Sequence, residues 1–393
     1  MFDFDKLVDR HGSWCTQWDY VSDRFGHADL LPFTISDMDF ATAPVIIEAL
    51  QQRITHGVFG YSRWKNDDFL SAIADWYQQC FQQNIEQHQL VYGPSVIYMV
   101  AQMIRQWSEP GDSVLIHTPS YDAFYKTIIG NQRQVLAAPL IKQGNLWHCD
   151  MQALEQLLAR GNCKIMLLCS PHNPTGKVWL RHELEQMSEL CARHQVRVIS
   201  DEIHMDMIMG DVSHTPWMVV ASQPYALFTS ASKSFNIPAL TGAYGFISDT
   251  EDRNHWFAAL KEADGLSSPA VMAIAAHIAA YRHGHQWLEA LRRYLKNNLQ
   301  YVAEQLNSRF PEINWSPPQA TYLAWIDLRP LKLDTRRLQE ILIDQQKIAI
   351  MPGEVYGPEG EGFLRFNVGC PRSKLQQGVG RLIKAIETGL GEK

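Results

Sequence analysis

Stretches with helical periodicity alternate with short apolar runs from about residue 40 to residue 250 of the chain. Apolar side chains recur every three or four positions in the helical stretches, and the short runs are rich in Val, Ile and Leu. This alternation predicts a mainly parallel β-sheet covered by helices, because parallel strands need crossover connections. The predicted strands are 90–92, 114–117, 165–169, 196–200, 227–229 and 243–247, and helices are expected at 44–50, 69–77, 96–107 and 182–193.

The pattern changes after about residue 250, where three helical stretches lead to a Pro-Pro pair at 317–318. These stretches are 253–261, 270–282 and 288–309. Beyond the pair, strands at 322–327, 348–351 and 363–368, a helix near 338–344 and a last helix from residue 374 predict a smaller α+β lobe. We place the boundary between the large and the small lobe in the long helix near residue 285.

The composition is that of a folded protein. Of 393 residues, 46% are apolar and 20% are charged, which excludes a disordered or fibrous chain. The formal net charge of −7 argues against nucleic acid as a direct partner, since phosphate binding needs clustered basic residues.

The cysteines and the first residues indicate the cellular compartment. Seven cysteines without a C-x-x-C pair are typical of free thiols in a reducing environment. The N-terminus carries acids where a signal peptide needs basic residues. The longest apolar stretch, near 270–280, is shorter than the roughly 18 residues of a membrane span. We therefore expect a cytoplasmic protein without a membrane-embedded part.

Polar side chains follow three successive predicted strands. They are Asn173 after strand 165–169, Asp201 with His204 after strand 196–200, and Lys233 after strand 227–229. Each has an ordinary explanation, because Asn before Pro starts turns, Asp after a strand caps helices, and a lone Lys usually lies in solvent. In an open parallel sheet, however, ligands bind beyond the carboxyl ends of the strands. The order of these groups at adjacent strand ends therefore favours one shared site.

This set of groups suits pyridoxal 5′-phosphate. A lysine with small neighbours can form a Schiff base, and a buried carboxylate can keep a pyridine nitrogen protonated. An amide and an imidazole can bind the ring oxygen. A phosphate site is predicted at 93–97 (Gly-Pro-Ser-Val-Ile), where a helix start offers free N–H groups, although a simple helix cap also explains this segment. Ser230 and Ser232 offer hydroxyls to the same phosphate.

Three segments resemble the motifs of fold-type I pyridoxal-phosphate enzymes, the aspartate aminotransferase superfamily. They are 173–176 (Asn-Pro-Thr-Gly), 201–204 (Asp-Glu-Ile-His) and 230–236 (Ser-Ala-Ser-Lys-Ser-Phe-Asn). Over essentially its whole length the chain resembles the MalY/PatB family of cystathionine β-lyases, with similar segments at 9–19, 36–40, 57–61, 118–125 and 364–371. The resemblance implies an α/β fold with a mostly parallel seven-stranded sheet in a large domain, 48–285, and a small domain formed by residues 1–47 and 286–393.

The resemblance also implies roles at the cofactor ring. Lys233 corresponds to the Schiff-base lysine that moves the substrate α-proton, and Asp201 to the partner of the pyridinium nitrogen. Asn173 corresponds to the donor to the cofactor 3′-oxygen. His204 stands where many aminotransferases have a tyrosine with the same task, and Tyr121 corresponds to the aromatic residue that stacks on the ring.

Further roles concern the phosphate, the substrate and the second subunit. The phosphate site would comprise Ser95, Val96, Ile97, Ser230 and Ser232, with Val96 and Ile97 acting through backbone N–H groups. Arg365 corresponds to the arginine that binds the substrate carboxylate, which Asn173 and Tyr121 also contact. Tyr61 corresponds to a catalytic tyrosine that reaches the phosphate of the neighbouring subunit, so a homodimer with shared active sites is implied. One departure is Thr241, since many aminotransferases have a phosphate-binding arginine there.

Three competing motifs are weak. Residues 230–233 match the S-x-x-K motif of penicillin-binding proteins, but the S-D-N and K-T-G strings of that class are absent from the sequence. Asp201, His204 and Asp206 lack the second histidine that a helical metal motif requires, so no metal site is predicted. Residues 175–177 (Thr-Gly-Lys) lack the upstream glycine of a P-loop.

The resemblance predicts a carbon–sulfur β-lyase that acts on a small amino-acid substrate, L-cystathionine or similar S-substituted cysteines. The products would be a thiol such as homocysteine, pyruvate and ammonia. A class I/II aminotransferase is the alternative, because both reactions share their first steps and spacing does not separate them. The resemblance also implies contact with the maltose-regulon activator MalT. Twelve tryptophans could include anchors for it, although most are expected in the core or the dimer contact.

Overall fold

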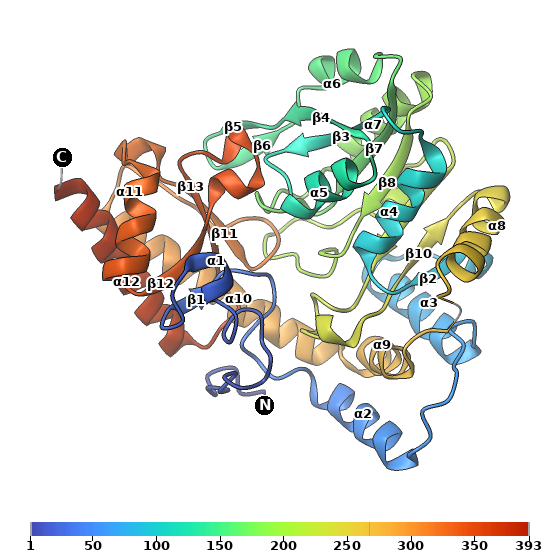
Figure 1. Ribbon diagram of the computed structural model, residues 1–393, viewed down its shortest axis with the longest axis horizontal. Helices are drawn as coiled ribbons and strands as arrows, with labels where there is room; N and C mark the ends of the chain where they lie inside the picture. The colour runs from blue at the N-terminus through green and yellow to red at the C-terminus, as the bar shows by residue number, and fades with distance from the viewer. Residues whose placement is uncertain (1, 267, 392–393) are drawn as a thin grey trace.

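The computed structural model describes residues 2–266 and 268–391, and its largest sheet has seven strands (Figure 1). Their order is β2-β10-β9-β8-β7-β3-β4. The bounds are β2 Leu90–Gly93, β3 Ser113–Thr118, β4 Gln134–Pro139, β7 Cys163–Cys169, β8 Arg197–Asp201, β9 Tyr225–Thr229 and β10 Ala243–Ile247. Strand β10 runs opposite to the other six strands, so its pairs with β2 and β9 are antiparallel. The remaining pairs of this sheet are parallel. The predicted mostly parallel seven-stranded sheet is therefore confirmed.

The central strands are continuous apolar runs because helices cover both faces of the sheet. In β7, Ile165 and Leu167 belong to one apolar cluster, whereas Met166 and Leu168 belong to another. One cluster includes side chains of α4 Val96–Trp107, α5 Asp122–Gly130 and α8 Thr250–Ala258. The other includes side chains of α3 Asp67–Phe81, α6 Met151–Leu158, α7 Arg181–Arg193 and α9 Val271–His283.

Side-chain caps fix where two of these helices begin. The Oγ atom of Ser95 accepts a hydrogen bond from the Tyr98 N–H at 3.2 Å and starts α4 directly after β2. The Oδ1 atom of Asn66 accepts from the Phe69 N–H at 2.9 Å and starts α3. Such caps satisfy N–H groups that have no partner inside the helix.

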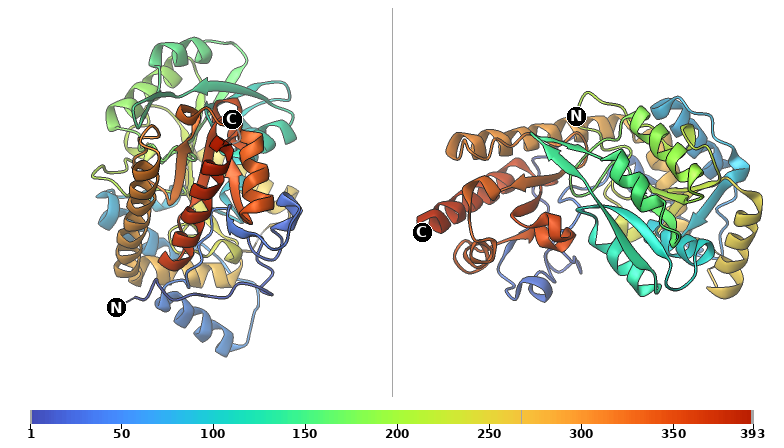
Figure 2. Two further views of the ribbon diagram at one scale, coloured as in Figure 1. Left: turned by 90° about the vertical axis from the view of Figure 1, so that its left-hand side faces the viewer. Right: turned by 90° about the horizontal axis from the view of Figure 1, so that it is seen from above.

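A separate four-stranded sheet, in the order β1-β12-β13-β11, lies beside the large one (Figures 1 and 2). Its strands are β1 Leu31–Phe33, β11 Leu323–Asp327, β12 Ile348–Pro352 and β13 Phe363–Asn367, and α10 His285–Arg309, α11 Thr335–Glu340 and α12 Arg372–Gly391 accompany it. Strand β1 pairs in parallel with β12, which brings an N-terminal segment into the C-terminal sheet. The division into domains at residues 47 and 285 stays a prediction that these two sheets support.

The remaining elements are short or peripheral. They are α1 Ser22–Phe25, α2 Pro44–His56, the hairpin β5 Ile141–Gln143 with β6 Leu146–His148, and π-helical turns at Ala259–Ala263 and Ile341–Gln345. Short 3-10 helices lie at Gln87–Gln89, Trp217–Val219, Pro238–Leu240, Arg329–Leu331, Gly353–Tyr356 and Pro358–Gly360. Helix α2 projects from the lower edge of the molecule in Figure 1. None of the helices within the described ranges has both the length and the apolar character to cross a membrane.

The predicted elements occur at their expected places with small shifts of their ends. The six predicted strands before residue 250 correspond to β2, β3, β7, β8, β9 and β10. Strand β4 was not predicted, because the run Gln-Val-Leu-Ala-Ala-Pro alternates at the sheet edge and ends in proline. Strand β1 and the β5–β6 hairpin were not predicted either, because their three-residue strands have no clear apolar pattern.

Candidate active site

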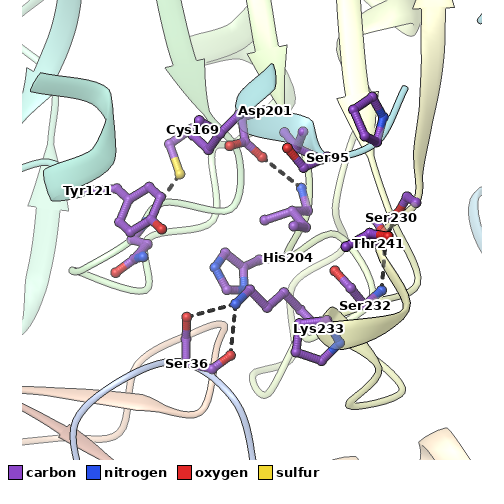
Figure 3. Close-up of a pocket in the computed structure, with 17 residues that line it drawn as sticks. Ser36, Ser95, Tyr121, Cys169, Asp201, His204, Ser230, Ser232, Lys233 and Thr241 are labelled. Atoms are coloured by element: carbon purple, nitrogen blue, oxygen red, sulfur yellow. Dashed lines mark hydrogen bonds between the residues drawn. The ribbon is translucent and has the colours of Figure 1, made fainter. Parts of the chain in front are cut away.

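A cavity of about 190 Å³ lies at the carboxyl ends of β7, β8 and β9 (Figure 3). Its lining contains ten of the twelve predicted site residues: Ser95, Val96, Ile97, Tyr121, Asn173, Asp201, His204, Ser230, Ser232 and Lys233. Because β9, β8 and β7 are neighbours in the sheet, the predicted adjacency of Lys233, Asp201 and Asn173 is confirmed.

Lys233 lies on the turn after β9, and its amine contacts the N-terminal segment. Its Nζ atom donates hydrogen bonds to the carbonyl oxygen of Ser36 at 2.8 Å and to its Oγ atom at 2.9 Å. Burial lowers the pKa of Lys233 to about 8, and the positive charge of Arg365 acts in the same direction, whereas Asp37 and Asp201 oppose it. About one tenth of the amine is therefore neutral at pH 7, far more than in an exposed lysine, and this neutral form is the one that a base or nucleophile requires.

Asp201 is the last residue of β8, and its carboxyl group has no ion-pair partner in the described part of the chain. One oxygen accepts from the Ile203 N–H at 3.1 Å. Burial raises the pKa of Asp201 to about 7, although this hydrogen bond and the charge of Lys233 oppose the rise. A cationic N–H, such as that of a protonated pyridine ring, would stabilise the ionised form of this buried and unpaired carboxyl group.

Arg365 is also buried without a carboxylate partner among the described residues, and it lies behind Asn173 rather than in the cavity wall. Its Nη1 atom donates to Asn173 Oδ1 at 3.2 Å and its Nη2 atom to the Thr34 carbonyl at 2.9 Å, while Nε has no partner. The guanidinium lies 4.7 Å from the centre of the Tyr356 ring. Arginine pairs well with carboxylates, so this position suits the binding of a substrate carboxylate.

His204 and Tyr121 lie on different sides of the cavity. Burial lowers the pKa of His204 to about 3, so the ring is neutral, and its Nδ1 atom has no hydrogen-bond partner. Figure 3 shows His204 beside Lys233, and Tyr121 with Cys169 opposite Ser230 and Thr241. A flat ring bound between these walls would have an aromatic side chain on one side and polar groups within reach.

The predicted phosphate site has hydroxyls and backbone groups but no basic side chain. Of the lining residues, Lys233 alone is cationic. Ser95 caps α4, and Val96 and Ile97 of its first turn line the cavity, so the start of this helix lies where an anion could bind. The Ser230 hydroxyl donates to the Gly242 carbonyl at 2.7 Å. Thr241 lines the cavity where many aminotransferases have an arginine.

Tyr61 lies away from the cavity of its own chain, unlike Arg365, which contacts the lining residue Asn173. Its side chain is 99% exposed, in the segment between α2 and α3. Neighbouring Val58 and Phe59 are exposed as well. Its role toward a second subunit stays a prediction.

Sequence reasoning assigned no role to several residues at the site. Ser36 lines the cavity, and the Tyr322 hydroxyl donates to its carbonyl at 2.8 Å. Tyr356 packs against Arg365. Residues 36–40 were one of the segments that carried the family resemblance, but only the folded chain shows that Ser36 contacts Lys233. The other lining residues without an assigned role are Cys169, Ile203, Pro238, Thr241 and Gly242.

Comparison with known proteins identifies the family, since the model of the family "Aminotransferase class I and II" matches residues 28–382. The chain belongs to the aminotransferase class I and II family. Within it, the chain is 66% identical to protein MalY of Escherichia coli K12 over 98% of its length and 99% of that protein. It is 33% identical to cystathionine β-lyase PatB of Bacillus subtilis, over 98% of this chain and 99% of PatB.

Solved structures with this fold superpose closely on the chain. Cystalysin from Treponema denticola, which contains a pyridoxal 5′-phosphate cofactor, gives a TM-score of 0.93 at 28% identity, over 99% of both chains. The pyridoxal-phosphate-bound C–S lyase from Staphylococcus hominis gives 0.93 at 26% identity, over 98% of both chains. The resemblance to fold-type I enzymes and to the MalY/PatB family is confirmed.

The substitution Asp201→Asn should stabilise the protein when no cofactor is bound. The folded-state pKa near 7 lies above the value of 3.8 for a free side chain, so ionisation at neutral pH destabilises the folded state. We expect the variant to raise the free energy of urea unfolding by about 2–4 kcal/mol at pH 8, because it cannot ionise. The gain should shrink as the pH falls from 7 towards 4, where the wild-type carboxyl group is protonated. A variant that is less stable than the wild type at pH 8 would contradict this account.

Proposed function

We propose that this chain is a pyridoxal-phosphate-dependent carbon–sulfur β-lyase, which cleaves L-cystathionine or similar S-substituted cysteines with water to a thiol, pyruvate and ammonia. The observation that carries the proposal is the joint placement of Lys233, Asp201 and Asn173 at three neighbouring strand ends. The relatives support the reaction, because they include cystathionine β-lyases and C–S lyases that match nearly the whole chain.

The described residues fit the cofactor. Asp201 would hold the ring nitrogen, Asn173 and His204 the ring oxygen, Lys233 the aldehyde carbon, Tyr121 one ring face, and Ser95, Val96, Ile97, Ser230 and Ser232 the phosphate. The unpartnered His204 Nδ1 and the unpaired Asp201 carboxyl group are the groups that such a ligand would satisfy. Pyridoxal phosphate supplies an aldehyde that condenses with amines and a ring that accepts an electron pair from the substrate α-carbon.

The chain's own groups would then bind the amino acid and move its protons. Arg365 would exchange its bonds to Thr34 and Asn173 for the two oxygens of the substrate carboxylate. Lys233 would take the α-proton in its neutral form, which the lowered pKa makes far more populated than in an exposed lysine. The thiolate would leave from the β-carbon.

An aminotransferase is the second candidate, since the family includes them and the same residues serve the first steps. The outcome depends on whether the thiolate leaves before a proton returns to the substrate or cofactor. The named β-lyases among the relatives with 30% or higher identity favour elimination.

The lyase proposal is tested by supplying L-cystathionine to the purified protein without any keto acid. We expect release of pyruvate and of a free thiol in equal amounts, and loss of both by at least 100-fold in Lys233→Ala, because the base and nucleophile are removed. Amino transfer to an added keto acid without thiol release would contradict the lyase proposal and favour the aminotransferase.

We also propose that two copies of the chain share their active sites through Tyr61. Its full exposure beside exposed Val58 and Phe59 supports a contact with a second subunit. A dimer of this kind would carry the tyrosine of one subunit to the phosphate site of the other.

Mixed dimers test this arrangement. Tyr61→Phe and Lys233→Ala would each be nearly inactive alone. If Tyr61 acts on the partner, dimers formed from equal amounts of both variants contain one intact site, so activity should recover to about a quarter of the wild-type value. If Tyr61 acts in its own chain, or not at all, mixing restores nothing beyond the sum of the separate variants.

Contact with the activator MalT and a cytoplasmic location remain part of the proposal. The 66% identity to MalY supports the first, and seven free cysteines support a reducing compartment. Among the twelve tryptophans, Trp217 and Trp256 are buried, Trp18 and Trp64 are partly buried, and Trp14 is 84% exposed. Retention of purified MalT on the immobilised protein should weaken in Trp14→Ala, and equal retention by wild type and variant would exclude this anchor.

A further inference from the structure

The segment 34–40 crosses from the small sheet to the large one and is held by an asparagine on each side. Asn367, two residues after Arg365, donates from Nδ2 to the carbonyl oxygens of Ile35 and Asp37. Asn236, three residues after Lys233, donates to the carbonyls of Met38 and Phe40, both at 2.8 Å, and accepts from the Met38 N–H. The backbone of this segment is therefore fixed relative to both Lys233 and Arg365.

This fixed segment presents two acceptors to the Lys233 amine. The Nζ atom donates to the Ser36 carbonyl at 2.8 Å and to the Ser36 hydroxyl oxygen at 2.9 Å, as Figure 3 shows. The Tyr322 hydroxyl donates to the same carbonyl at 2.8 Å, which fixes the direction of that acceptor. Ser36 is thus a defined binding position for a free amine.

The next residue, Asp37, carries a carboxylate that attracts the Lys233 ammonium from a longer distance, since the two groups form no direct ion pair within the described residues. Its Oδ2 atom pairs with Arg10 at 2.7 Å, while its Oδ1 atom is buried without a hydrogen-bond partner. Arg10 also pairs with Asp39 at 2.9 Å, so two carboxylates share its positive charge. A buried carboxylate oxygen without a donor gains from any positive charge that forms nearby.

We propose that Ser36 and Asp37 receive the Lys233 amine whenever it is not joined to the cofactor: Ser36 accepts its hydrogens, and Asp37 is the counter-ion of its ammonium form. When the amine takes a substrate α-proton, its lone pair forms the new N–H bond and the C–H electron pair stays with the substrate. Lys233 then carries a positive charge inside the protein, which needs a nearby anion. Both are positioning residues. Their role rests on the proposed pyridoxal-phosphate chemistry of Lys233, but it is the same for a lyase and for an aminotransferase.

The other groups around Lys233 do not supply this anion. Arg365 on β13 repels the ammonium, and His204 after β8 is neutral because burial lowers its pKa to about 3. Tyr322 is a neutral phenol whose pKa burial raises further. Asp201 on β8 attracts the ammonium, but it faces the position proposed for the cofactor ring. Among the charges that raise the pKa of Lys233, Asp37 has the larger effect.

The proposal is tested on the full-length protein after removal of the cofactor. Brief labelling with acetic anhydride across roughly pH 6 to 10 modifies only the neutral amine, and peptide mass spectrometry gives the titration midpoint of Lys233. Asp37→Asn should lower this midpoint by about one pH unit, because the ammonium loses its counter-ion, and Asp37→Glu should restore it. Ser36→Ala, which removes one acceptor, should lower the midpoint less.

Ser232→Ala is the matched control. Ser232 lines the same cavity next to Lys233, but the amine donates its hydrogen bonds to Ser36 and not to the Ser232 hydroxyl. It should leave the midpoint unchanged. A midpoint in Asp37→Asn equal to that of the wild type, with both proteins folded by circular dichroism, would overturn the proposal. An unchanged midpoint in Ser36→Ala would do the same if Asp37→Asn did not fold.

Discussion

Three ionisable groups without ion-pair partners, at one cavity and directly beside it, are the constraint on which this site depends. Asp201 and Arg365 are buried and Lys233 is partly buried, and no salt bridge within the described residues compensates any of them. Burying an unpaired charge is costly unless the group is neutralised or paired. Burial raises the pKa of Asp201 and lowers that of Lys233, which favours the neutral form of each group. A ligand with a cationic ring nitrogen and a substrate with a carboxylate would satisfy the same groups directly.

The two sheets hold these charges at different places in the fold. The large sheet fixes Asp201 and Lys233 at neighbouring strand ends, whereas Arg365 comes from β13 of the small sheet. The segment 34–40 contacts both, since Thr34 accepts from Arg365 and Ser36 accepts from Lys233. Substrate binding at Arg365 would therefore act on the same segment that holds the catalytic amine. The fold would thus link binding of a carboxylate to the position of Lys233.

The sequence predicted the site where local patterns were enough. Short apolar runs followed by Asn173, Asp201 and Lys233 identified three strand ends, because parallel strands place their carboxyl ends at one edge. The edge strand β4 was missed, since its alternating pattern ends in proline. The carboxylate-binding role of Arg365 was predicted only from the family resemblance. Ser36 and Tyr322 were not assigned, because their contacts join residues nearly 200 and 286 positions apart, and no local pattern encodes such distances.

The central claim is that Lys233 is the residue that holds pyridoxal phosphate. The most direct measurement is to reduce the purified protein with borohydride, digest it, and locate the pyridoxyl group by peptide mass spectrometry. The account predicts a single modified peptide, with the group on Lys233. Modification of a different lysine, or none in a protein that contains the cofactor, would contradict it.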